Sequence, residues 1–180
     1  MASTKMAIIV VSILLVSTCV LAYPFYTYSK SFPPLLPGTL IVWQENMTMP
    51  DGTAISRTLA VRILSYLGHD RFAVEISEDH GRAMGLLGPG LLYIPPEHLG
   101  KDTVEVGRTP LRLIGRLVIT VPAGKFEAYE YSLSFAGGNI TVNAWYHTTM
   151  GILLKLDAKM VMGNKTAVTK VVLLSIRKGR

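Results

Sequence analysis

Apolar and polar residues alternate along most of the chain after residue 38. A period of two is typical of β-strands that bury one face. In one segment Tyr129, Tyr131 and Leu133 occupy one set of positions, while Glu130 and Ser132 occupy the other. The predicted strands include 59–63, 72–76, 111–121, 129–135, 140–146, 152–160 and 166–176.

Short turns separate neighbouring strands and indicate antiparallel pairing. The turn signals are Gly68–Asp70, Gly137–Asn139 and Gly163–Asn164. We therefore expect an all-β antiparallel meander of about eight or nine strands that forms a half-barrel, barrel or sandwich. One hydrophobic transmembrane or signal helix precedes it, and no other segment has a helical period of useful length.

The connection from Glu78 to Pro110 interrupts the alternation and is rich in Gly and Pro. We expect one helical turn at Pro95–Gly100, because Pro starts helices and Gly ends them. The apolar residues of this connection could cover an open end of the core, or contact a cavity, a bilayer or a partner. This apolar contact loop comprises Met84, Leu86, Leu87, Leu91 and Leu92.

An uncharged apolar run, Ala7–Ala22, follows Lys5 near the start of the chain. As a helix it would span about 24 Å, and Tyr23–Tyr28 would lengthen it and lie at headgroup depth, as in a signal anchor. A signal peptide cleaved near Val20–Ala22 is the main alternative. Lipidation of Cys19 is a third interpretation, and an inert Cys19 within the helix is favoured over it.

We divide the chain into a leader (1–28), a Pro-rich linker (29–37) and an extracytoplasmic β domain (38–180). The domain is anchored to a membrane, or secreted if the leader is cleaved. Of 18 basic residues one precedes the apolar run and all 12 acids follow it, so the remainder carries 17 − 12 = +5. This charge suits contact with anionic headgroups or an acidic glycan coat. The basic residues are dispersed, so nucleic acid is not an expected partner.

Three of the four asparagines open an Asn-x-Thr triplet: Asn46, Asn139 and Asn164. N-glycosylation at these residues would require surface positions and an extracytoplasmic location. Ordinary turn and strand chemistry is the alternative explanation.

The residues offer little catalytic chemistry. The histidines, His69, His80, His98 and His147, lack the spacing of metal or hydrolase motifs. The only cysteine is Cys19, so the β domain has no disulfide or cysteine-based metal site. We expect no enzyme, no cofactor and no metal site.

Two segments, Val118–Tyr129 (VITVPAGKFEAY) and Trp145–Lys155 (WYHTTMGILLK), carry a resemblance. They resemble a pattern in secreted and lipoprotein β domains similar to the lipoprotein-carrier fold of the LolA and LolB type. The resemblance implies a curved sheet that holds an acyl chain or another apolar ligand, and it implies no catalytic residues.

We expect a non-enzymatic, membrane-anchored domain that binds a lipid or other hydrophobic small molecule. The row Leu111, Leu113, Leu117 and Ile119 would line the ligand face. The alternative is a structural or assembly subunit of the cell envelope, pilin-like or envelope-linking, that binds other envelope proteins.

Overall fold

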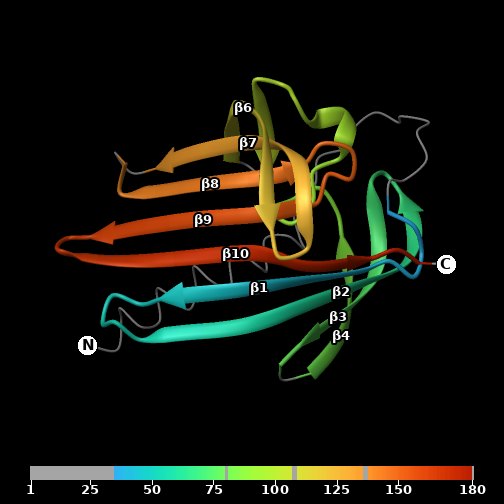
Figure 1. The fold of residues 1–180 in the computed structure, drawn as a ribbon, viewed down its shortest axis with the longest axis horizontal. Coiled ribbons are helices and arrows are strands. Elements are labelled where there is room, and N and C mark those ends of the chain that lie inside the picture. Colours follow the sequence, from blue (N-terminus) through green and yellow to red (C-terminus); the bar gives the residue numbers. More distant parts are fainter. Residues whose placement is uncertain (1–34, 80, 107–108, 136–137, 180) are drawn as a thin grey trace.

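The computed structural model describes residues 35–179 apart from 80, 107–108 and 136–137. They form one antiparallel sheet of ten strands in the order β4-β3-β2-β1-β10-β9-β8-β7-β6-β5 (Figure 1). The strands are β1 Leu40–Thr48, β2 Ala54–Gly68, β3 Arg71–Glu78, β4 Gly81–Leu87, β5 Thr103–Val106, β6 Thr109–Val121, β7 Gly124–Phe135, β8 Ile140–His147, β9 Leu153–Met162 and β10 Lys165–Arg177. A 3-10 helix, η1, covers Pro96–His98.

The all-β antiparallel class and the predicted strands are confirmed. The expected eight or nine strands are ten, because β4 and β5 form within the segment predicted to be an irregular connection. The single helical turn that was predicted there is η1. The barrel is wrong, because β4 and β5 end the strand order on opposite sides and do not pair with each other.

In the described part of the chain, no helix has the length and apolar character needed to cross a membrane. The predicted leader and most of the predicted linker lie outside the described residues.

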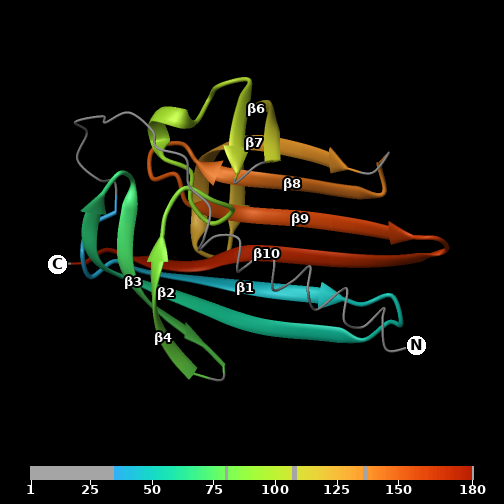
Figure 2. The same ribbon diagram turned by 180° about the vertical axis from the view of Figure 1, so that it is seen from behind.

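The hairpin of β6 and β7 bends over the sheet and crosses β8, β9 and β10, as both views show (Figures 1 and 2). At its tip the amide of Ala123 donates a hydrogen bond to the carbonyl oxygen of Leu173 on β10, at 3.3 Å. Phe126 of the hairpin and Trp145 of β8 pack against one buried cluster that includes Leu173. The hairpin therefore covers part of the sheet with its own strands.

The connection between β4 and β5 packs against the start of β9. The amide of Ile94 donates to the carbonyl of Gly151 at 2.9 Å, and the amide of Leu153 donates to the carbonyl of Leu92 at 3.0 Å. Gly151 has a φ of +70°, and a Cβ there would lie 1.9 Å from the carbonyl oxygen of Ile94. Only glycine permits both this backbone conformation and this approach.

Trp43 joins strands that are not neighbours in the sheet. Its ring is 1% exposed on β1, and its Nε1 donates to the carbonyl oxygen of Leu153 on β9, at 2.8 Å across β10. The last β9–β10 partner pair is Lys155 with Val172, so β10 does not pair with Leu153.

We expect Trp43→Phe to lower the free energy of unfolding by about 1–3 kcal/mol, because a buried carbonyl loses its donor. Chemical denaturation followed by circular dichroism would measure the change. Trp145→Phe is the control, since that ring is only partly buried. Equal costs for the two variants would contradict a special role for the Trp43 hydrogen bond.

Candidate functional site

The central strands carry different residues on their two faces. Strand register places one largely apolar row across six strands: Ile55, Met47, Thr169, Ala158, Val142 and Leu133. Each of these residues is preceded or followed in the chain by a member of a polar row on the other face: Ser56, Asn46, Lys170, Asp157, Asn143 and Ser132. We call these sides the apolar face and the polar face, because side chains alternate between the two sides of a strand.

The apolar face changes in exposure along this row. Met47 and Val142 are buried, Thr169, Ala158 and Leu133 are partly buried, and Ile55 is exposed. Val142 belongs to a cluster of buried residues that also contains Tyr131, Ala144 and Leu156. A fully packed core thus continues into a partly open apolar surface.

The predicted ligand row, Leu111, Leu113, Leu117 and Ile119, does not lie on one face. A bulge between Leu113 and Gly115 inserts Ile114, and one extra residue shifts the later side chains to the opposite side. Leu111 and Leu113 belong to or pack on the cluster that contains Val142, whereas Ile119 packs on the cluster that contains Leu173. Leu117 is exposed. The structure thus brings two of the four to the apolar face.

The predicted apolar contact loop is also divided. Met84 and Leu86 are exposed on β4, and Leu87 is buried in the core. Leu91 and Leu92 are partly buried, and the carbonyl of Leu91 accepts a hydrogen bond from the Tyr146 hydroxyl at 2.9 Å. One of the predicted interpretations was that this loop covers the core. Leu87 and Leu92 fit that interpretation, whereas Met84 and Leu86 lie on the surface.

An ion pair that we did not predict lies on the apolar face. Register aligns Arg57 and Glu45 with Val171 and Leu156, and Nε of Arg57 donates to the Glu45 carboxylate. Nη2 of Arg57 is buried and has no hydrogen-bond partner among the described residues. An uncompensated guanidinium N–H is suited to a carboxylate or phosphate group. The sequence signal for this ion pair was the presence of two opposite charges, Glu45 and Arg57, at positions of the strands that otherwise carry apolar residues.

A second unpredicted group forms where the β2–β3 turn meets η1. Asp70, Glu97 and His98 bring one ligand atom each to within 4.8 Å of one another. Burial, followed by the negative charge of Glu97, raises the pKa of the Asp70 carboxyl. Two carboxylates and an imidazole could hold a divalent cation. The residues come from distant segments, so the sequence had no recognisable spacing.

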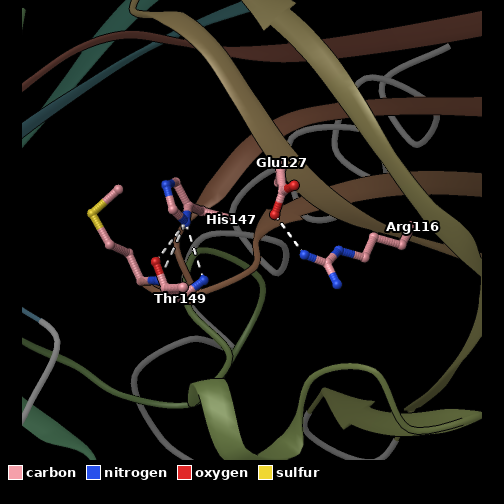
Figure 3. A network of polar contacts seen from close by, with 5 residues as sticks. Arg116, Glu127, His147 and Thr149 are labelled. Atoms are coloured by element: carbon pink, nitrogen blue, oxygen red, sulfur yellow. Dashed lines mark hydrogen bonds and ion pairs between the residues drawn. The ribbon is translucent and has the colours of Figure 1, made fainter.

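His147 caps the turn between β8 and β9 (Figure 3). Its Nδ1 accepts hydrogen bonds from the amides of Thr149 at 3.1 Å and Met150 at 3.3 Å. Burial lowers the pKa of His147, and the negative charge of Glu127 opposes this effect. Glu127 itself accepts a hydrogen bond from Arg116 at 2.6 Å. Each partner is a turn or strand group, so this network is structural.

The three sequon asparagines, Asn46, Asn139 and Asn164, are all exposed. Asn139 and Asn164 lie in the turns before β8 and before β10, and Asn46 lies near the end of β1. These turns and this strand end are at one end of the sheet, while the C-terminus is at the other (Figure 1). The first described residue, Leu35, lies at the same end as the C-terminus. Nearby, the amide of Gly38 donates to the carbonyl oxygen of Ile63, and Leu40 pairs with Arg177.

No family model matches the chain, and no curated protein matches it. Solved structures with partial likeness include a protein described as exported, with a YmcC-like fold, from Bacteroides fragilis. Its TM-score is 0.46 at 13% identity, covering 82% of this chain and 99% of that one. A protein described as a lipoprotein from Parabacteroides distasonis gives 0.46 at 12% identity, covering 81% and 97%.

A DUF1329 family protein from Desulfovibrio piger gives a TM-score of 0.30 at 10% identity, covering 78% of this chain and 85% of that one. All three scores are below 0.5, so the fold of this chain is defined by its own strand order and register. The resemblance to the lipoprotein-carrier fold stays a prediction.

The turn capped by His147 should weaken in acid. A histidine whose folded-state pKa lies below its unfolded value stabilises the fold while neutral, and this contribution is lost as pH falls below about 6.5. We expect His147→Asn, whose side-chain oxygen can accept the same amide bonds, to remove this part of the pH dependence. Melting temperatures from pH 8 to pH 5 would show it, and parallel curves for both proteins would contradict the capping role.

Proposed function

We propose that this protein is a non-enzymatic extracytoplasmic domain, held at a membrane by its leader, that binds an apolar ligand on the apolar face. The observation that carries the proposal is the cross-strand row from Leu133 to Ile55, which continues a packed cluster into partly exposed surface. The leader and the three exposed sequons support the location.

The residues on this face suit an acyl chain. Ala158 and Thr169 are small side chains at the centre of the row, between Val142 and Met47. An acyl chain laid across them would gain about 0.8 kcal/mol for each CH₂ that it removes from water. The polar face offers no such gain, since Lys170 and Asp157 occupy the matching positions.

The Arg57–Glu45 ion pair is a polar group within the apolar face. Its unpaired Nη2 could donate to the oxygen of a lipid headgroup or a fatty-acid carboxylate. Glu45 already accepts from Nε of the same guanidinium, which keeps the arginine in place. The ligand class that fits is therefore an amphiphile with an acyl chain and an oxyanion.

Adjacent residues of β10 allow a matched test of the ligand face. We expect Thr169→Glu to weaken binding of oleate by at least about tenfold, because the new charge would have to be desolvated beside the acyl chain. Lys170→Glu, on the polar face, should bind nearly as the natural chain does. Native mass spectrometry of the full chain, released from detergent micelles with added oleate, would measure bound and free fractions.

Circular dichroism would confirm that both variants are folded. Equal oleate binding by the two variants would rule out the apolar face as the site. Absence of any oleate adduct on the natural chain would contradict ligand binding itself.

We further propose that Asn46, Asn139 and Asn164 carry N-linked glycans. Peptide mass spectrometry of the protein from its native envelope should show sugar masses on these three residues and none on Asn143, which lacks a sequon. Replacing Thr48, Thr141 or Thr166 by Ala should remove one glycan each. Unmodified peptides throughout would contradict the proposal.

A further inference from the structure

Large apolar side chains are exposed mainly at one end of the molecule. Ten such residues are exposed in the described part of the chain, and seven of them lie on β2, on β4 or just before β1. Ile55, near the start of β2, pairs with Met47 and is separate from the other six. We call these six the proximal patch: Leu36, Leu64, Tyr66, Leu67, Met84 and Leu86. Leu36, Leu67 and Met84 are 54%, 52% and 72% exposed.

Backbone pairing holds most of the proximal patch together. Gly38 bonds the carbonyl of Ile63, which places the segment that contains Leu36 beside Leu64. Register aligns Ser65, Ala73 and Leu86 in one row across β2, β3 and β4. Met84 lies two residues before Leu86, so both side chains are on the same side of β4. The patch thus collects side chains from adjoining segments at one end of the sheet. Tyr66, which aligns with Phe72 and Leu87, lies on the opposite side of these strands from Leu86.

Basic residues accompany the proximal patch. Arg71 at the start of β3 and Arg82 on β4 are exposed, as are Arg177 and Lys178 where the chain passes Gly38. Asp70 and Glu97 lie at the same end, so the local charge is mixed and the apolar area supplies most of the attraction. Exposed apolar side chains with basic neighbours match the interface of a bilayer that contains anionic lipids.

The proximal patch also lies where the chain enters the domain. Twelve residues separate Ala22, the end of the apolar run, from Leu35, the first described residue. Fully extended, twelve residues reach at most about 40 Å. An anchored leader would therefore keep this end of the sheet near the membrane and leave the sequon end farther away.

We propose that the proximal patch rests on the surface of the bilayer in which the leader is anchored. Leu67 and Met84 enter the headgroup region, while Arg71 and Arg82 contact anionic lipids. The sheet then stands with its sequon turns toward the outside. This proposal rests on the leader remaining attached, and it does not depend on the apolar face binding a ligand.

Spin labels on the full chain in lipid nanodiscs would test the contact. The background is Cys19→Ser, with single labels at Leu67→Cys and Met84→Cys, in one part phosphatidylglycerol to three parts phosphatidylcholine. Ile114→Cys is the matched control, because Ile114 is 59% exposed on β6, outside the proximal patch. Collision with oxygen reports lipid, and collision with a water-soluble nickel chelate reports water.

We expect the ratio of oxygen to nickel collisions to be severalfold higher at positions 67 and 84 than at 114. Equal ratios at the three positions would overturn the proposal. Exclusion of both reagents at 67 and 84 would also overturn it, because that result indicates a protein partner. Failure of the chain to co-elute with nanodiscs would remove the anchor on which the proposal rests, whereas oleate binding would still be measured separately.

Discussion

The consecutive residues Ile152, Leu153 and Leu154 at the start of β9 are all fully buried, so this part of the open sheet must be covered on both of its sides. Bending provides this cover here. Bulges interrupt the register at Val42/Trp43, Leu113/Gly115 and Trp145/Tyr146, and bulges bend strands and increase their twist. The bent β6–β7 hairpin then covers β8 to β10, and the connection that contains Tyr93 packs against the start of β9. Trp43 reaches the start of β9 as well, where its indole N–H donates to the carbonyl oxygen of Leu153.

The sequence predicted the strands that follow the simple rule of one buried face. It also predicted the β2–β3 turn, where His69 and Asp70 have φ values of 51° and 56°, as a two-residue hairpin turn requires. β4 could not be recognised from the sequence, because its large apolar residues lie on the side of the strand that faces solvent. Met84 and Leu86 face solvent, while the small Gly85 lies under Ile76, where a Cβ would come within 2.8 Å of Cδ1.

The candidate sites depend on bulges and on which strands are neighbours, and the alternation of apolar and polar residues reveals neither. A single inserted residue, Ile114, reversed the side on which Leu117 and Ile119 lie, and nothing in the local pattern indicated it. The Arg57–Glu45 pair and the group around Asp70 required knowledge of which strands are neighbours. Register is set by long-range packing, so a correct list of strands still left the binding face unassigned.

The two ends of the sheet constrain which functions are compatible. An assembly subunit would offer a free strand edge to a neighbour, and the edges of this sheet are β4 and β5. β5 has four residues and offers little backbone to pair with. β4 is longer but carries Met84 and Leu86 of the proximal patch. If that patch lies on a bilayer, pairing through β4 would compete with the membrane for the same strand. The apolar face at the centre of the sheet, between Val142 and Met47, stays available in either case. A membrane-resting domain that binds an apolar ligand would use the proximal patch and the apolar face together, whereas assembly through β4 would compete for the proximal patch.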